Sequence, residues 1–313
     1  MFSLPAWLND FIIIFLGLVI EAIPFILLGV ALSSLLSFVI TDRQILRWLP
    51  KNRFLALCYA TVTGFLLPVC ECGNVPLARK FAIKGVPPYV AITFLLAAPV
   101  INPIVLFSTW AAFRDMPEVI IFRMVFAVIT AFAVGLIFSF AHERREVLHE
   151  NIVKVIDARN AHGDHHHGGH QHHHQHAGSG KWSAFLQTIQ VEFLEMTTLM
   201  IIGALIAAAT QTFVPREWIV SLGTGPIISI VAMLILAFVV SICSNVDAFF
   251  ALAYAPTFTT GSIVAFLVFG PMIDLKSLLM MSTTFRWRTL AIISVITVQI
   301  VFILSLILNL YVN

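Results

Sequence analysis

The chain has 313 residues, of which 59% are hydrophobic and 11% are charged, and its mean hydropathy is +0.96. A soluble core could not hide so much apolar surface, so the composition excludes a soluble globular protein and indicates an integral membrane protein in a lipid bilayer. The formal net charge of +2 gives no reason to expect a nucleic-acid partner.

Apolar runs of helical length recur along the chain, so we predict an all-α protein. They cover residues 11–40, 54–69, 88–110, 119–141, 186–213, 226–242, 262–282 and 289–311. The first run has no Lys or Arg before it and is much longer than the core of a signal peptide, so we interpret it as a spanning helix that is retained. Three of the four cysteines lie beside breaks in apolar sequence rather than in polar loops, so we expect no structural disulfides.

Residues 67–80 read LPVCECGNVPLARK and interrupt apolar sequence with two thiols, a carboxylate and helix-breaking residues. Irregular backbone at membrane depth must be packed inside protein or line a wet cavity, so this stretch is expected to face inward. Pro68 ends a first helical arm, Asn74 is a good N-cap, and Pro76 fits the first turn of a short second arm that ends near Lys84. The pattern predicts a re-entrant helical hairpin.

A polar stretch, residues 142–182, separates the fourth and fifth apolar runs and contains all eleven histidines. Its composition cannot bury apolar surface, so we predict a disordered, cytoplasmic linker that binds zinc or similar divalent ions weakly. The alternative is a solvated spacer in which the histidines matter little. No other cofactor is expected. The candidate metal ligands are His162, His165, His166, His167, His170, His172, His173, His174 and His176.

The sequences on the two sides of this linker resemble each other. Polar landmarks recur in the same order at a nearly constant spacing of about 172 residues. The matched landmarks are Glu21 with Glu195, each eight residues before a glycine (Gly29 and Gly203), then Cys72 with Cys243, and Asn102 with Asp274. We therefore predict two membrane repeats, residues 1–141 and 183–313. In the second repeat, Asn245 is expected to cap the half-helix of a second hairpin.

The orientation of the repeats depends on whether the short runs cross the membrane. If residues 54–69 and 226–242 belong to re-entrant hairpins, each half has three full spans, the halves are inverted, the linker is cytoplasmic and both termini lie outside. If these runs cross completely, eight spans result, the repeats are parallel and the linker is outside. We prefer the inverted arrangement, because it returns the cations after the first hairpin to the same side as the positive loop 41–53.

Cys72 and Cys243 lie just before the expected N-termini of the two half-helices. A helix N-terminus favours thiolate over thiol, and thiolates are ligands for soft ions. We therefore predict that Cys70, Cys72 and Cys243 meet across a pseudo-two-fold axis and bind substrate. The alternative is that they are small residues at a tight packing point. The other candidate substrate-binding residues are Asn74, Asn245 and Asn102.

Five acidic residues fall inside apolar runs or hairpins, where ionisable groups are costly and usually functional. Lys276 can neutralise one of them, so some of the others are expected to titrate and to couple transport to protons. They are Glu21, Glu71, Glu195, Asp247 and Asp274.

Several motifs resemble the bacterial predicted-permease family that includes the organoarsenical exporter ArsP. They are LPVCECGNVPLARK (67–80), KGVP (84–87), AAPVINPIVLFST (97–109), SNVDAFFA (244–251) and FGPMIDLKSLLMM (269–281). The resemblance implies a polytopic permease of the bacterial cytoplasmic membrane. For characterised relatives it implies efflux of trivalent organoarsenicals, with Cys70 and Cys72 at the arsenic site. Cys243 matches only through the internal repeat, and the His-rich linker is not a feature of the arsenical branch.

Three functions fit this sequence. The first is a secondary transporter that exports a soft metal or metalloid, with the thiols as ligands and the acids as the proton path. The second is a transporter of zinc or another divalent metal, with the linker as collector or sensor. The third is a membrane thiol oxidoreductase that uses Cys70 and Cys72, but a redox pair needs neither a second half nor buried acids. The sequence has no ATP-binding motif and leaves open a homo-oligomer or a partner membrane subunit.

Overall fold

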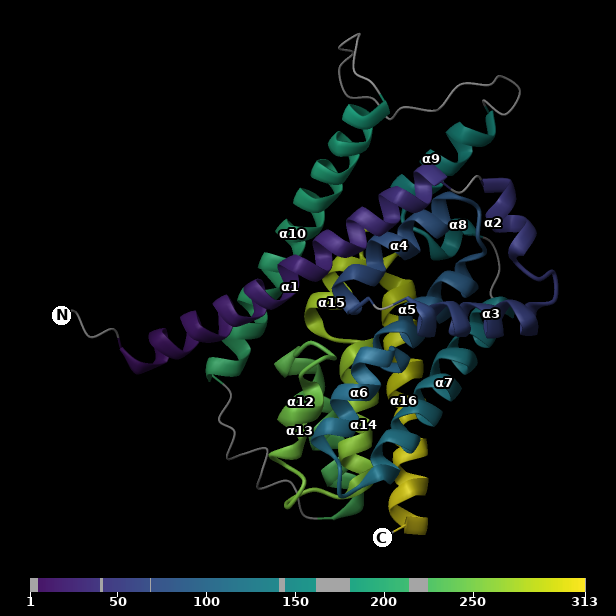
Figure 1. Cartoon of the computed structure of the whole chain (residues 1–313). Helices are drawn as coiled ribbons and strands as arrows, with labels where there is room; N and C mark the ends of the chain where they lie inside the picture. The colour runs from purple at the N-terminus through teal and green to yellow at the C-terminus, as the bar shows by residue number, and fades with distance from the viewer. Residues whose placement is uncertain are drawn as a thin grey trace.

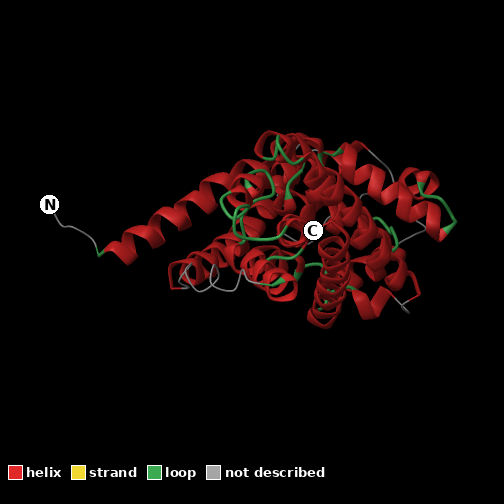
Figure 2. Cartoon of the chain, turned by 90° about the horizontal axis from the view of Figure 1, so that it is seen from below, coloured by secondary structure: helices red, strands yellow, loops and turns green. Residues whose placement is uncertain are grey.

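The computed structural model describes residues 5–39, 42–67, 69–140, 144–161, 181–213 and 225–312. The regular structure of these residues is helical, with no β-strand among them, as Figure 1 and Figure 2 show. The prediction of an all-α protein is therefore confirmed. The histidines proposed as metal ligands, His162 to His176, lie outside the described residues.

The two halves of the chain present the same order of long, short and broken helices. The first half forms α1 (Ala6–Val39), α2 (Asp42–Trp48), α3 (Arg53–Leu66), α4 (Glu71–Ile83), α5 (Pro88–Ile101), α6 (Pro103–Ala112) and α7 (Pro117–Phe140). The middle of the chain forms α8 (Arg144–Val147) and α9 (Glu150–Ala161). The second half forms α10 (Lys181–Phe213), α12 (Pro226–Val240), α13 (Asp247–Leu252), α14 (Thr260–Met272), α15 (Leu275–Met281) and α16 (Trp287–Val312).

Six segments are long and apolar enough to cross a membrane, three in each half. They are Trp7–Leu36, Pro88–Ala112, Pro117–Phe140, Phe185–Phe213, Thr260–Met281 and Trp287–Tyr311. The helices α3 and α12 are apolar but shorter. The protein is therefore a multi-pass membrane protein, and the number of full spans agrees with the version in which each half adds a hairpin.

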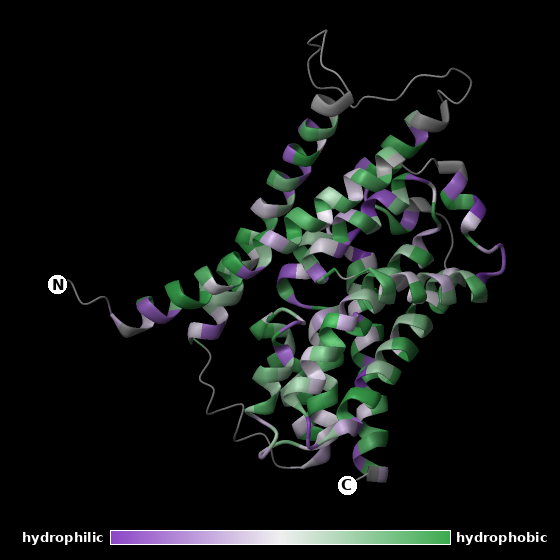
Figure 3. Ribbon diagram, in the orientation of Figure 1, coloured by the Kyte–Doolittle hydropathy of each residue, from purple (hydrophilic) through white to green (hydrophobic). Residues whose placement is uncertain are grey.

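The hydrophobic core lies around α5 and α14, which pack against each other and are buried along nearly their whole length. In contrast, α1 and α10 pack along each other at one edge of the molecule (Figure 1). Many of their large apolar side chains are exposed, and Figure 3 shows hydrophobic colour along the outer helices. Such surfaces are what a lipid environment covers.

Each pair of short helices, α3 with α4 and α12 with α13, returns the chain to the end of the bundle from which it started. For α3 and α4, a Cβ on Gly85, just after the pair, would lie 3.8 Å from Leu46 Cδ1, just before it. For α12 and α13, the hydroxyls of Ser229, in the first turn of α12, and Ser262, in the first turn of α14, are 2.7 Å apart. Both pairs therefore have the geometry of hairpins.

The two hairpins open at opposite ends of the bundle, and α16 gives the direction. At its start, Arg286 N–H donates to the Val147 carbonyl of α8, and α9 also packs against α4 of the first hairpin. Near its end, Asn309 accepts from Gly261 N–H and donates to the Pro226 carbonyl, both at the mouth of the second hairpin. The whole length of α16 therefore separates α8 from the opening of the second hairpin.

Glycines let the long helices approach the short ones. A Cβ on Gly29 of α1 would lie 2.5 Å from Gly73 Cα of α4, and a Cβ on Gly203 of α10 would lie 2.9 Å from Lys276 Cα of α15. Real Cβ contacts are not this short, so both positions require glycine, as close helix contacts in membranes commonly do. The repeated glycines thus bring α1 and α10 against the two helices that carry Glu71 and Lys276.

Residues 144–161, which we expected to be part of a disordered linker, are mostly helical and form α8 and α9. Leu148, Ile152 and Ile156 recur at four-residue spacing and are buried, and Leu148 pairs with Phe285 through an isolated bridge. One apolar stripe is enough to pack a short helix against a larger body. The rest of the predicted linker, 162–180, lies outside the described residues.

Candidate functional site

The first hairpin places Glu71 at the start of α4. The helix begins at Glu71 with Cys70 as N-cap, and the Cys70 carbonyl accepts from Gly73 N–H and Asn74 N–H. The prediction that Asn74 caps this helix is therefore wrong, because Asn74 already lies inside it. Pro76 is also interior, and its missing N–H leaves the Cys72 carbonyl without the usual helical donor. Polar backbone is thus concentrated beside the thiols.

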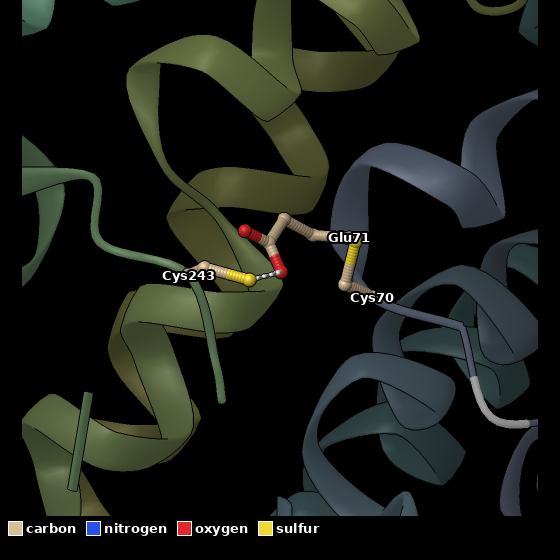
Figure 4. Close-up of side chains that lie close together, drawn as sticks. All are labelled: Cys70, Glu71 and Cys243. Carbon is tan, nitrogen blue, oxygen red and sulfur yellow. Dashed lines mark hydrogen bonds between the residues drawn. The ribbon is translucent and has the colours of Figure 1, made fainter. Parts of the chain in front are cut away.

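Glu71 connects the two halves of the chain through both carboxylate oxygens. Its Oε1 lies 3.3 Å from Lys276 Nζ on α15, while Oε2 accepts from Ser244 Oγ at 3.2 Å and from Cys243 Sγ at 3.8 Å. Glu71 is 2% exposed. Figure 4 shows Glu71 projecting from the start of α4 toward Cys243 on the loop between α12 and α13. A buried carboxylate with donors on both oxygens is held firmly in one orientation.

Two cysteines lie next to this carboxylate. The Sγ atoms of Cys70 and Cys243 and a Glu71 oxygen all lie within 4.8 Å of one another (Figure 4). Cys72 is also buried. The structure therefore brings two of the three predicted thiols, Cys70 and Cys243, together with Glu71. All four cysteines of the chain are free thiols.

The second hairpin reaches the cluster by an unusual turn. Ser241 ends α12 in the left-handed conformation (φ 47°, ψ 43°), which L residues other than glycine and asparagine rarely adopt. Two residues later Cys243 faces the cluster. Asn245 is half-buried, but α13 begins at Asp247 with Val246 as N-cap, so the prediction of an Asn245 cap is wrong. The turn at Ser241 changes the direction of the chain at the end of α12.

Two further acids belong to the same neighbourhood. Asp274 Oδ2 lies 3.8 Å from Lys276 Nζ, and Asp274 Oδ1 accepts from Ser277 N–H at 2.6 Å as the N-cap of α15. Glu21, half-buried on α1, is near enough to Lys276 and Glu71 to interact with them electrostatically. Two carboxylates, those of Glu71 and Asp274, thus lie beside one ammonium, which leaves an excess of negative charge when both are ionised.

Asp247 has a cation of its own, which the sequence analysis missed. Arg123 of α7 donates to both Asp247 oxygens, at 3.0 and 2.6 Å, and to Thr109 Oγ1 at 2.7 Å. Arg123 is fully buried and Asp247 is 1% exposed. The sequence analysis counted Lys276 as the one cation for these acids, able to neutralise one of them, and so overlooked this second buried cation. A single Arg inside an apolar run was the signal for this pair.

Glu195 is paired away from the thiols. It lies 2.8 Å from Arg79 and is partly exposed, and the neighbouring Glu192 pairs with Lys80. Both acids are on α10, and both cations are on α4, about two turns beyond Glu71. These ion pairs connect α4 to the half of α10 that is nearer its N-terminus, which follows the linker.

The predicted asparagines have different positions. Asn102 is buried between α5 and α6, accepts from Ile104 N–H at 2.8 Å and donates to the Val69 carbonyl at 3.4 Å. Asn102 therefore helps to fix the backbone at Val69, the residue that precedes Cys70. Asn74 is fully buried, and both polar atoms of its side chain lack a hydrogen-bond partner. An unpartnered buried amide marks a place where a ligand or water would be stabilised.

Chemically, the cluster offers two sulfur atoms and one carboxylate oxygen within reach of a single ion. Sulfur ligands select soft ions, and a mixed sulfur and oxygen set also accepts zinc-like ions. The ligands come from both halves of the chain, and all are buried. The arrangement is suited to holding an ion or metalloid at the junction of the two halves.

Comparison with known proteins gives a consistent result. The sequence model of a family described as predicted permease (ArsP_1) matches residues 7–310. UPF0718 protein YcgR of Bacillus subtilis is 41% identical over 275 residues, which is 88% of each chain. A Streptococcus mutans protein named "Putative two-component membrane permease complex subunit" is 36% identical over 285 residues, 91% of this chain and 90% of that one. No solved structure matches the chain.

Proposed function

The chain belongs to the predicted-permease family, as its motifs indicated, and on that premise we propose that this membrane permease exports a soft metal or metalloid species. In this proposal Cys70, Cys243 and Glu71 are the substrate ligands. The proposal rests on one observation, namely that these three ligand atoms lie within 4.8 Å of one another in a buried site. A coincidence of packing would not require a carboxylate between the thiols.

A trivalent organoarsenical fits the two thiols. Arsenic in a monoalkyl arsenous acid keeps its bond to carbon and has two bonds to hydroxyl groups. Cys70 and Cys243 would each give a proton to a leaving hydroxyl, so that two arsenic–oxygen bonds become two arsenic–sulfur bonds and two waters leave. The acid side chains near the thiols can receive and return these protons. The reaction is reversible by water, as transport requires.

A divalent cation such as zinc is the second candidate, and a different observation favours it. Glu71 supplies a hard oxygen ligand, and the two carboxylates of Glu71 and Asp274 leave an excess of negative charge around the one ammonium of Lys276. A divalent ion would balance that excess, whereas a neutral arsenical would not. For this substrate the His-rich segment 162–176 would act as collector or sensor.

The route to the site follows from the hairpins. They open at opposite ends of the bundle and meet at the thiols, which is the arrangement of inverted-repeat transporters. We propose alternating access between the two ends. The pairs of Arg79 with Glu195 and of Lys80 with Glu192 would close the linker side in the state described. A partner membrane subunit remains part of the proposal, since the Streptococcus mutans relative is named as a complex subunit.

Uptake into everted membrane vesicles tests the function. Vesicles with wild type, Cys70→Ser, Cys243→Ser or Cys58→Ser protein would be given methylarsenite or zinc, with and without a proton gradient. Cys58 lies on α3 outside the cluster and is a matched control. We expect Cys70→Ser and Cys243→Ser to lower thiol-dependent uptake by about tenfold or more, and Cys58→Ser to leave it unchanged.

Two results would redirect the proposal. Equal uptake by the wild type and the Cys70→Ser/Cys243→Ser protein would remove the thiol site. Zinc uptake that persists without these thiols and stops when residues 162–176 are deleted would move the chemistry to the histidines and carboxylates.

A further inference from the structure

Lys276 is a buried ammonium between two carboxylates on different elements. Its Nζ lies 3.3 Å from Glu71 Oε1 on α4 and 3.8 Å from Asp274 Oδ2 at the start of α15. Lys276 and both acids are at most 2% exposed. A charge so far from water is stable only beside opposite charge, so the ammonium must remain with one or both acids.

The carboxylates of Glu71 and Asp274 differ in how many of their oxygens have a hydrogen-bond partner. Both oxygens of Glu71 have partners, since Oε2 accepts from Ser244 and Cys243. Asp274 uses Oδ1 to cap α15, while its buried Oδ2 has no hydrogen-bond partner. The ammonium therefore rests on Glu71, and the second carboxylate offers an unused acceptor within a short movement of Nζ.

Only the side chain of Lys276 needs to move. Its backbone is held by Gly203 of α10, where even a Cβ would lie 2.9 Å from Lys276 Cα. A lysine side chain has several rotatable bonds and reorients without displacing its helix. The shift between Glu71 and Asp274 is thus a local rotamer change on a fixed backbone.

The first half of the chain lacks this arrangement. In the repeat, Asn102 matches Asp274, and Ile104 therefore occupies the position of Lys276. Asn102 also caps its helix through a side-chain oxygen, as Asp274 does. The capping role therefore needs no charge, and the carboxylate and ammonium of the second half are additions to a structure that forms without them.

A cation bound to the thiols and Glu71 would lie directly beside the Lys276 ammonium. We propose that Lys276 is a built-in counter-cation that holds Glu71 when the site is empty and transfers to Asp274 when a cationic substrate binds. This inference rests on the proposed function, because it assumes that the thiol cluster binds substrate. Asp274 is then a positioning residue, since it acts through Lys276 and does not touch the substrate.

This exchange, in which the Lys276 ammonium moves from Glu71 to Asp274, has two consequences for transport. In the empty site the ammonium pairs with Glu71, so Glu71 is not left as an unpaired buried charge. Occupation also breaks the link between α4 and α15, because the ammonium then belongs to α15 alone. A neutral arsenical held by the two thiols does not compete for Glu71, so it needs no exchange. Lys276 therefore discriminates between cationic and neutral substrates.

Binding of Cd²⁺ and methylarsenite to purified full-length protein tests this inference. Cd²⁺ bound to thiolate gives an ultraviolet charge-transfer absorption, and methylarsenite binding is followed by calorimetry. The proteins are wild type, Asp274→Asn, Lys276→Met and the double variant, with Cys58→Ser as control. Asparagine keeps the cap of α15, as Asn102 does for α6.

We expect Asp274→Asn to weaken Cd²⁺ binding about tenfold in the presence of Lys276 and much less in the Lys276→Met background. Methylarsenite binding should be the same in Asp274→Asn and wild type.

An equal loss of Cd²⁺ affinity in both backgrounds would overturn the exchange and make Asp274 a simple source of charge. An equal loss for both ligands would show a structural defect and also overturn it. No Cd²⁺–thiolate absorption in wild type would instead reject the thiol site of the proposed function.

Discussion

Single residues at the junction of the two halves form buried ion pairs in an otherwise apolar bundle. Glu71 contacts Lys276, Ser244 and Cys243, all from the second half. Arg123, from the first half, contacts Asp247 of the second half. Each half thus supplies a charge that the other half neutralises. These contacts require both halves to be assembled before either buried charge is satisfied.

Arg123 is the residue whose removal should destabilise the fold most. Its guanidinium is fully buried and bonded to both oxygens of Asp247. Arg123→Met would leave the Asp247 carboxylate buried without a partner, which costs about 3–5 kcal/mol. We expect a lower midpoint of thermal unfolding in detergent, and partial recovery in the Arg123→Met/Asp247→Leu variant.

An exposed arginine provides the control for this prediction. Arg114 lies over the Trp110 ring at 4.9 Å on the surface, so Arg114→Met should change stability little. If Arg123→Met and Arg114→Met have the same small effect, the buried pair does not stabilise the protein as described.

At the level of elements, the hairpins decide how the chain crosses the membrane. The mouth of α3 and α4 lies on the side of α8 and α9, and the mouth of α12 and α13 lies at the far end of α16. Complete crossings by α3 and α12 would separate Leu46 from Gly85 and Ser229 from Ser262. The contacts between these residues therefore favour hairpins over two further spans.

Side-specific labelling tests this arrangement. Single cysteines at the exposed positions Lys51, Asn151 and Asp115 would be introduced into a Cys58→Ser background and treated with an impermeant maleimide from each side. We expect Lys51→Cys and Asn151→Cys to react from one side and Asp115→Cys from the other, because α5 with α6 and α7 are full spans. Reaction of Asp115→Cys from the same side as Lys51→Cys, with Asn151→Cys opposite, would contradict the hairpins and indicate eight spans.

For the molecule as a whole, the sequence predicts the architecture more accurately than it predicts the local geometry. The count of spans, the two hairpins and the inward position of Cys70 and Cys243 follow from long apolar runs and from the cost of irregular backbone in lipid. These are large and simple free-energy terms. They depend on composition over many residues and hardly on the exact conformation of any one.

The features that the sequence analysis missed depend on distant contacts. Asn74 has the chemistry of an N-cap, but α4 starts earlier because the Cys70 carbonyl accepts the first helical bonds. Asp247 has the chemistry of a proton carrier, but Arg123 lies 124 positions away in sequence and 2.6 Å away in space. Glu195 is likewise paired with Arg79. Sequence shows that these groups are buried or costly, whereas only the fold shows which partners they meet.

Arsenic X-ray absorption of the purified protein loaded with methylarsenite shows directly whether Cys70 and Cys243 bind one substrate atom between the two halves. We expect two sulfur neighbours around arsenic in wild type and in Cys58→Ser, and one in Cys243→Ser. An arsenic atom with the same sulfur neighbours in wild type and in Cys70→Ser/Cys243→Ser would contradict this expectation.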